Sequence, residues 1–258
     1  MTGKPVEKTV QDTTSRRKRA QSRPPEGPAR FSDLATTTRA NAIYLEMHRA
    51  IASMELLPGT AISENVISER MGVSRTPVRE AVLRLTKEKL VEVVPQSGTF
   101  VARIPLSALT EALVVRRALE AVTVRAGVVQ ATPSQIMGFH TLIQQQRDIA
   151  ETGDMESFHR ADEEFHAEFA KVGKYPGVWD LIRQVKIQVD RYRRLTLPLA
   201  GRMEMIVQEH EAVVDALSVG DATLAVERME QHLDHLRLDV CIVRDTWPDY
   251  FIHDITVD

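Results

Sequence analysis

The stretch SENVISERMGVSRTPVREAVLRLTKEKLVEVVPQSGTFV, residues 63–101, decides the fold of the N-terminal part of the chain. It predicts two short helices joined by a turn at Gly72, followed by a two-stranded hairpin. Ser63 and Ser74 stand where helix caps are expected, and Pro77 lies in the first turn of the second helix, where proline is tolerated. Apolar residues recur at three- and four-residue spacing in the second helix: Val78, Ala81, Val82 and Leu85.

The hairpin is predicted from two apolar runs, Val91 to Val94 and Thr99 to Val101, around the turn Pro95-Gln96-Ser97-Gly98. Two helices and such a wing form a winged helix-turn-helix, whose second helix enters the major groove of DNA by its N-terminal residues. Arg75, Thr76 and Arg79 lie there, off the apolar stripe, and arginine can bind guanine or phosphate. The alternative is an ordinary helical hairpin with a solvated basic end.

The amino-acid sequence of residues 36–103 resembles the GntR family of bacterial transcription regulators. The matching motifs are L-x-P-G at Leu56 to Gly59, G-V-S-R-T-P-V-R-E-A at Gly72 to Ala81, and G-T-F-V at Gly98 to Val101. The resemblance implies that Ser74, Arg75, Thr76 and Arg79, with the wing residue Gly98, contact double-stranded operator DNA. The chain departs from the family at Asn65, at Lys89 in place of a glycine, and at Gln96-Ser97 in the wing tip.

The 258 residues suffice for two domains, each with its own core. A single cysteine, Cys241, excludes an intramolecular disulfide and fits a reducing, cytoplasmic location. No apolar run approaches the ~20 residues that span a membrane. The net charge of the whole chain is −3, but its N-terminal segment is basic, since residues 1–30 carry eight Lys/Arg and three Asp/Glu.

The predicted fold class is mainly α: a winged helix-turn-helix followed by an all-helical bundle. We expect a disordered basic tail over 1–30, a DNA-binding domain over 31–103, a helical domain over 104–246 and a tail over 247–258, which either packs as a strap or stays loose. The first helix is expected near 36–55. Turn residues then separate helices near 107–130, 133–152, 154–171, 176–196, 203–219 and 222–245, with no strand among them.

Four polar residues of the helical part stand on apolar stripes. Asp162 and His166 share a helical face with three phenylalanines, while His210 and His232 each interrupt the stripe of a later helix. A buried carboxylate is unfavourable unless it is paired or coordinated, and three imidazoles beside it favour a metal ion. His210 and His232 lie 11 residues either side of Asp221, where the turn between their helices is expected. If the two helices pack antiparallel, both histidines lie at the same distance from that turn along the helix axes.

This pattern predicts a divalent metal site, with an ordinary buried hydrogen-bond network as the alternative. The other histidines, at 48, 140, 159, 235 and 253, lack the phasing and are interpreted as structural. Residues 107–240 resemble the FadR-type all-helical domain called FCD. That resemblance implies zinc or nickel bound by Asp162, His166, His210 and His232, and a nearby pocket for an organic acid.

Arg116 is the candidate for binding that acid. It lies at the edge of the expected apolar stripe Ala112, Val115, Leu119 and Val122, where its guanidinium group could clamp a carboxylate. The alternative is a surface ion pair with Glu120, four residues on. Arg191, Arg193 and Arg194 are interpreted as mainly a solvated face, although one could point inward.

Together these features predict a transcription regulator, more often a repressor, that binds a two-fold operator as a homodimer and responds to an acid effector. One recognition helix reads too few base pairs for useful selectivity, hence the dimer. Two alternatives remain: a regulator for which the metal is itself the signal, and a metalloenzyme using open coordination positions.

Overall fold

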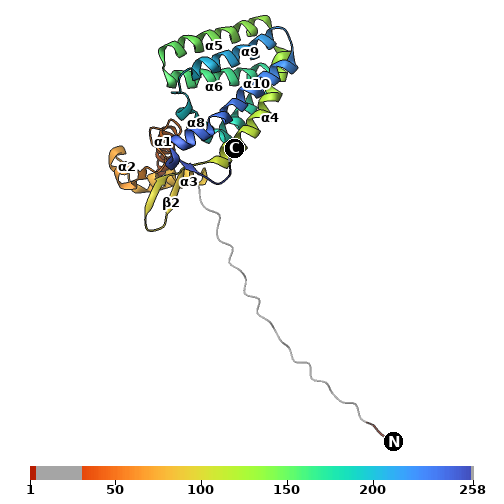
Figure 1. Ribbon diagram of the computed structural model, residues 1–258. Helices are drawn as coiled ribbons and strands as arrows, with labels where there is room; N and C mark the ends of the chain where they lie inside the picture. The colour runs from red at the N-terminus through yellow and green to blue at the C-terminus, as the bar shows by residue number, and fades with distance from the viewer. Residues whose placement is uncertain (4–30, 257–258) are drawn as a thin grey trace.

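The structure is a computed structural model that describes residues 1–3 and 31–256. A bundle of long helices forms one part of the molecule, and a smaller part combines helices with a short sheet (Figure 1). The predicted fold class is confirmed. The predicted basic tail lies almost entirely outside the described residues.

The winged part begins with α1 (Phe31–Ala52), which packs against α3 (Arg75–Lys87), and α3 also contacts α2 (Glu64–Met71). Strands β1 (Ala61–Ile62), β2 (Val91–Val94) and β3 (Gly98–Val101) form an antiparallel sheet in the order β1-β3-β2. Val91 lies opposite Val101, and Val94 opposite Gly98. The core is made by apolar side chains of α1, α3 and the sheet, including Ile43, Ile51, Val78, Leu85 and Val101.

The two serines predicted as caps behave differently. Ser63 Oγ accepts a hydrogen bond from the backbone N–H of Val66 at 3.4 Å, whereas the Ser74 hydroxyl makes no capping hydrogen bond. Gly72 ends α2 with φ of 62°, in the left-handed region that glycine adopts readily. The Ser74 side chain is exposed.

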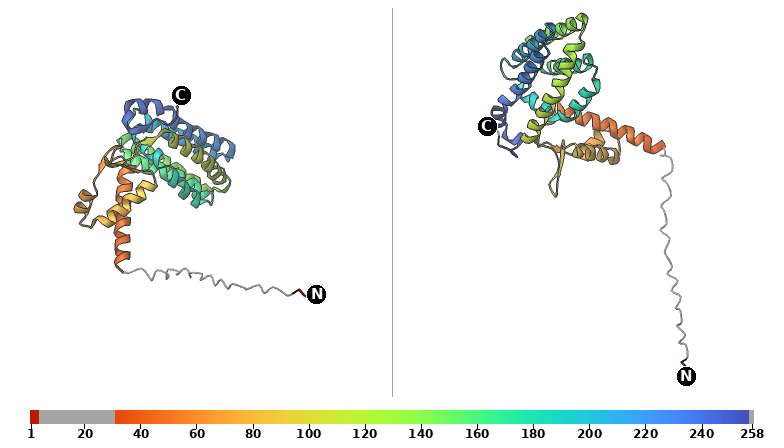
Figure 2. Two further views of the ribbon diagram at one scale, coloured as in Figure 1. Left: turned by 90° about the horizontal axis from the view of Figure 1, so that it is seen from below. Right: turned by 90° about the vertical axis from the view of Figure 1, so that its right-hand side faces the viewer.

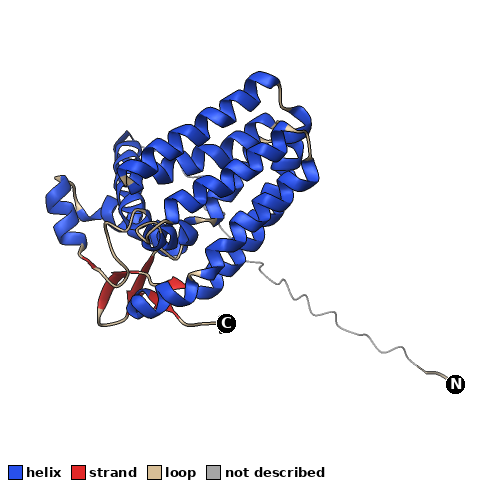
Figure 3. Ribbon diagram, turned by 45° about the horizontal axis from the view of Figure 1, so that its top comes forward, coloured by secondary structure: helices blue, strands red, loops and turns tan. Residues whose placement is uncertain are grey.

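The helical part contains α4 (Leu106–Gln130), α5 (Pro133–Thr152), α6 (Met155–Val172), α9 (Arg202–Ser218) and α10 (Ala222–Leu238). Thr132 and Gln135 form a capping box at the start of α5, and Asp154 and Asp221 cap α6 and α10. The aromatic side chains of the core come from α5 and α6: Phe139, Phe158, Phe165 and Phe169. Figure 3 shows that helices make up nearly all of this part, while the strands gather at the lower left of the view.

Two helices expected to be continuous are each broken. Residues 176–196 form α7 (Pro176–Val185) and α8 (Ile187–Thr196), separated at Lys186, and α10 is followed by α11 (Val240–Thr246) after Asp239. Neither junction contains glycine or proline, so the sequence carries no break signal there. Lys186 is buried, and its ammonium group contacts the carboxylates of Glu163 and Asp190.

The C-terminal tail packs as a strap. After a short 3-10 turn, η1 (Pro248–Tyr250), strand β5 (Phe251–Ile252) pairs in parallel with β4 (Ile104–Pro105), the segment that joins the two parts. Asp254 accepts a hydrogen bond from the backbone N–H of Ser107 at 3.0 Å, at the start of α4. The prediction of no strand beyond residue 107 was therefore wrong, because pairing with a distant segment creates β5.

The buried face of α4 differs from the expected one. Val115 and Val122 are exposed, whereas Leu113, Arg116, Glu120, Val124 and Gly127 face the bundle. Arg116 and Glu120 neutralise each other, which makes their burial possible. Gly127 packs against Phe169, where an added Cβ would lie 3.0 Å from the ring. Among the residues described, no helix is long and apolar enough to cross a membrane.

Candidate nucleic-acid interface and metal centre

The N-terminal end of α3 presents Arg75, Thr76 and Arg79 to solvent around one hollow. The side chains of Arg75 and Arg79 are 59% and 62% exposed, so both are available to a partner. Each has an Nη2 atom near Oε2 of Glu64, at 3.5 and 3.4 Å. Surface pairs of this kind are weak, so DNA phosphates or guanine can compete for the guanidinium groups.

The wing contains two residues with positive φ. Gly98 has φ of 133°, and Gln96 at the tip has φ of 62°. Lys89, which precedes the wing, has φ of 58°, in the left-handed region where glycine is favoured. The departure from the GntR pattern at Lys89 therefore falls at a position where the backbone conformation suits glycine better than lysine.

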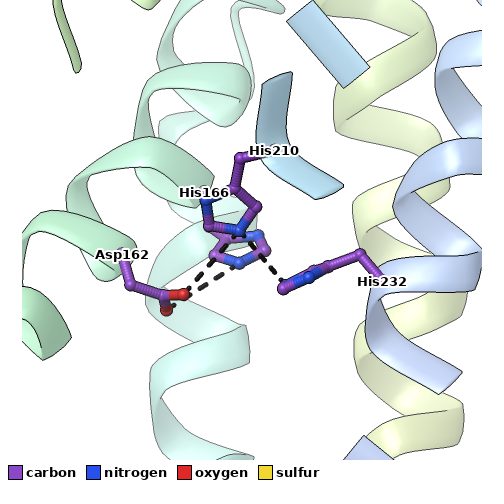
Figure 4. A group of neighbouring side chains, drawn as sticks. All are labelled: Asp162, His166, His210 and His232. Atoms are coloured by element: carbon purple, nitrogen blue, oxygen red, sulfur yellow. Dashed lines mark hydrogen bonds and ion pairs between the residues drawn. The ribbon is translucent and has the colours of Figure 1, made fainter. Parts of the chain in front are cut away.

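The structure brings together the four residues predicted to bind metal. Asp162 and His166 come from α6, His210 from α9 and His232 from α10, and one ligand atom from each lies within 4.8 Å of the others. Figure 4 shows these four side chains converging on one point. His210 Nε2 lies 3.2 Å from His232 Nε2 and 3.7 Å from Asp162 Oδ1. All four residues are buried.

In each of the three histidines, Nδ1 lies beside a side-chain oxygen of a residue that was not predicted to belong to the metal site. His210 Nδ1 lies 2.8 Å from Gln146 Oε1, and His232 Nδ1 lies 2.7 Å from Glu209 Oε2. His166 Nδ1 lies 2.5 Å from Glu120 Oε2. Because the amide nitrogen of Gln146 donates to the Ala161 carbonyl at 2.9 Å, its oxygen faces His210 and accepts a hydrogen bond from Nδ1–H.

This arrangement fits a metal cation. An imidazole that donates from Nδ1 keeps a lone pair on Nε2, and histidines that bind metals are held in this way by outer oxygen acceptors. Here the Nε2 lone pairs of His210 and His232 point at each other, and Asp162 adds a carboxylate. Such a cluster of acceptors is repulsive unless a cation lies among them or a proton is shared.

Burial keeps two of the imidazoles neutral. It lowers the pKa of His210 well below its usual value, and the neighbouring His232 lowers it further. The pKa of His232 is also lowered, chiefly by burial, although Glu209 opposes that shift. Neutral imidazole is the form that binds a metal ion, so both side chains are in the required protonation state at neutral pH.

Arg193 binds Asp162 from α8, although the three arginines 191, 193 and 194 were expected to form mainly a solvated face with at most one pointing inward. Arg191 and Arg193 are buried rather than part of a solvated face. Both terminal nitrogens of Arg193 donate to Asp162, one of them to Oδ1 at 2.5 Å. Burial alone would raise the pKa of Asp162, but Arg193 and the nearby imidazoles hold that pKa well below its usual value. The carboxylate is therefore ionised.

Arg116 forms an ion pair with Glu120, with Nε 2.7 Å from Oε1, in the interior rather than on the surface. Burial raises the pKa of Glu120, yet Arg116 and His166 together bring it down to about 2. Glu120 then reaches His166 with its other oxygen. Arg116 is thus connected to the four-residue cluster through one carboxylate.

A second group of possible ligands, His159, Glu163 and Asp190, lies beside a cavity of about 1000 Å³ between α1 and helices α6, α7 and α8. Here the ammonium group of Lys186 already lies against both carboxylates. One positive charge of the protein therefore already offsets part of the negative charge of this group. The cluster around Asp162 remains the better candidate for a metal.

An exposed arginine-bearing helix on a winged helix-turn-helix, joined to an all-helical domain, defines a DNA-binding transcription regulator rather than an enzyme. Residues 39–101 match the family described as bacterial regulatory proteins, gntR family, and residues 111–235 match the FCD domain. The chain belongs to the GntR family and carries an FCD domain.

Two relatives support this assignment, and two solved structures share the fold. An uncharacterized HTH-type regulator of Streptomyces ambofaciens is 33% identical over 84% of this chain and 91% of its own length. The HTH-type transcriptional repressor RspR of Escherichia coli is 30% identical, over 81% and 92%. E. coli McbR/YncC has a TM-score of 0.65 at 19% identity, covering 81% of this chain and 98% of its own. A putative GntR regulator from Rhodococcus has a TM-score of 0.63 at 23% identity, over 77% and 95%.

Proposed function

We propose that this regulator binds a divalent metal, zinc or nickel, through Asp162, His166, His210 and His232, and responds to an organic acid bound beside the ion. The observation that carries the proposal is the orientation of the imidazoles. His210 and His232 each turn Nδ1 to an outer oxygen and Nε2 toward the other imidazole, and His210 Nε2 lies 3.7 Å from Asp162 Oδ1. When bound, the ion would hold three helices together and attract an anion as a Lewis acid.

The balance of buried charges favours an acidic effector. Glu120, Asp162 and the largely buried Glu209 carry three negative charges, and Arg116 and Arg193 carry two positive ones. With neutral imidazoles, a divalent ion leaves one positive charge in excess. A carboxylate would neutralise that charge, and Arg116, which contacts Glu120 through Nε, is the nearby group that could bind it with its terminal nitrogens.

For DNA binding, we propose that Ser74, Arg75, Thr76 and Arg79 contact the operator from the major groove while the wing around Gly98 contacts the backbone. The exposure of the two arginines supports this role. A homodimer would place two such helices on a two-fold operator in the cytoplasm. Repression is the proposed sign of regulation, since RspR is named a repressor.

One experiment separates the acid sensor from the alternative in which the ion itself is the signal. Operator duplexes are selected from random sequence with metal-loaded protein, and affinity is then measured for metal-stripped, zinc-loaded and nickel-loaded protein, each with a panel of organic acids. We expect at least one acid to change affinity only when metal is present. A response to metal alone supports the alternative. An equal acid response of stripped and loaded protein contradicts the proposed site.

A matched control is available in His140, a histidine of α5 that contacts Ser218 and is separate from the cluster. His140→Ala should keep the metal-dependent response of the wild-type protein. His210→Ala combined with His232→Ala should abolish that response. This comparison separates loss of the metal centre from the general effect of removing a histidine.

A further inference from the structure

The linker between the two parts of the molecule, residues 102–107, is held from two sides. Arg191 of α8 is buried and donates through Nη2 to the backbone carbonyl of Ala102 at 2.6 Å. From the other side, β5 of the C-terminal tail pairs in parallel with β4, which forms the middle of the linker. The right view of Figure 2 shows the dark-blue C-terminal segment at the junction of the bundle and the winged part. The linker is therefore not a free hinge.

Asp254, which follows β5, caps the helix that the linker leads into. The residue before α4 is Pro105, whose side chain makes no capping hydrogen bond. Instead, the carboxylate of Asp254 accepts hydrogen bonds from the backbone N–H of Ser107 at 3.0 Å and from its hydroxyl at 2.5 Å. Burial raises the pKa of Asp254, but the hydrogen bonds from Ser107 outweigh this effect and keep the pKa below its usual value. The carboxylate is ionised at neutral pH, the state that is favoured at a helix N-terminus.

Phe251 of β5 anchors the tail in an apolar cluster that belongs to both parts of the molecule. Its side chain is 2% exposed, and the cluster includes Ile104 of the linker and Val189 of α8. Met54, which follows α1 in the winged part, packs against the same cluster. Burial of an aromatic side chain of this size favours the docked position of the tail.

Both the linker and the tail lie outside the matched family domains. The match to the gntR family ends at residue 101, and the match to the FCD domain covers residues 111–235. The linker lies between the two matched ranges, and the tail lies after the second. The two family domains therefore do not account for the contact between linker and tail.

We propose that the C-terminal strap, residues 248–254, clamps the linker and so fixes the winged part in one orientation relative to the helical part. Two domains joined by a short linker move relative to each other unless contacts prevent it. Here β5 and Asp254 supply such contacts opposite Arg191. A fixed linker also holds the recognition helix α3 in a defined position, and this consequence rests on the proposed function, because it matters only if α3 binds DNA.

Trypsin reports whether the linker is held, because Arg103 is exposed within it. Cleavage after Arg103 requires the local backbone to leave its partners, so its rate follows the population of the open linker. Asp254→Ala should raise this rate about tenfold, through loss of two hydrogen bonds to a charged group. Removal of residues 251–258 should raise it further. Mass spectrometry identifies the fragment that begins at Ile104.

Asp249→Ala is the matched control, since it removes an exposed carboxylate from the same tail. This variant should be cleaved after Arg103 at the wild-type rate. Circular dichroism and metal content should be unchanged in all three variants, because the strap contacts none of the four residues around the candidate metal position. These two measurements separate release of the linker from unfolding of the helical part.

Operator binding tests the consequence for DNA recognition. The protein without residues 251–258 should bind its operator about tenfold more weakly, because a recognition helix with more orientational freedom loses more entropy on binding. Asp254→Ala should show a smaller loss, and Asp249→Ala should bind like the wild type. Fluorescence anisotropy with labelled operator measures the three affinities.

The outcomes separate the strap from the proposed function. Equal cleavage after Arg103 in the wild-type, Asp254→Ala and truncated proteins overturns the clamp. Faster cleavage in both variants with unchanged operator affinity overturns the claim that the clamp holds the recognition helix. A wild-type protein that binds no DNA contradicts the proposed function, and the clamp is then decided by the trypsin result alone. Faster cleavage together with weaker operator binding establishes both roles of the strap.

Discussion

The guanidinium group of Arg193 binds both carboxylate oxygens of Asp162 in the interior of the helical domain. Asp162 is also one of the four residues that converge on the candidate metal position. A single buried carboxylate therefore faces an arginine on one side and three imidazoles on the other. The stability of the domain and its affinity for metal are linked through this residue.

Replacing Arg193 by leucine should destabilise the metal-free protein by about 3–5 kcal/mol, because Asp162 would remain as an uncompensated buried charge. Saturating zinc should recover part of this loss, since the ion supplies positive charge to the same carboxylate. Urea unfolding with EDTA or with zinc measures both values. Arg183→Leu, at an exposed site, is the control. An identical loss with and without zinc would show that Asp162 does not contact the ion.

Gln146→Leu should weaken metal binding by about 10–100-fold, because His210 loses the oxygen that fixes its Nδ1 proton and its ring orientation. Competition with a chromophoric chelator measures the affinity. Gln145→Leu alters the neighbouring exposed position on α5 and should leave the affinity unchanged. Equal affinities of the two variants would argue against a role for Gln146 in the metal centre.

Arg75→Ala and Arg79→Ala should each reduce operator affinity by about 10–100-fold, the loss that corresponds to one or two base or phosphate contacts. Metal content and helicity should not change, because both side chains are more than half exposed. Fluorescence anisotropy with labelled operator gives the affinities. Arg70→Ala on α2 controls for the loss of one surface charge. Wild-type affinity in both variants would exclude the assigned recognition helix.

Lys89→Gly should stabilise the protein by about 0.5–1 kcal/mol, because lysine at φ of 58° occupies a conformation that favours glycine. Lys87→Gly, in the last turn of α3, should instead destabilise it by about the same amount. Thermal unfolding of both variants measures the difference. Destabilisation by Lys89→Gly would show that the lysine side chain makes a compensating contact.

The sequence was sufficient to predict most of the helices and the equal height of His210 and His232 on two of them. Asp221 caps α10 just after α9 ends, so residues equally far from it on the two helices come to the same height. The winged part was predictable because Gly72, Pro77 and Gly98 fix its turns locally. In both cases the information lies within a short stretch of chain.

The residues that surround the four converging side chains could not be predicted in the same way. Arg193 lies on the buried side of α8, although arginine as a residue type favours a solvated position. Glu120, Gln146 and Glu209 come from three different helices and meet the imidazoles only after the bundle packs. On α4, the outward valines were expected in the core because residue type alone does not say which face is inside.

The most direct test of the central claim is the metal content per chain, measured by elemental analysis on protein purified without added chelator. We expect about one zinc or nickel ion per wild-type chain. The variant in which both His210 and His232 are alanine should retain almost none, while His140→Ala should retain the wild-type amount. Equal metal in all three proteins would contradict the assignment of Asp162, His166, His210 and His232 as a metal centre.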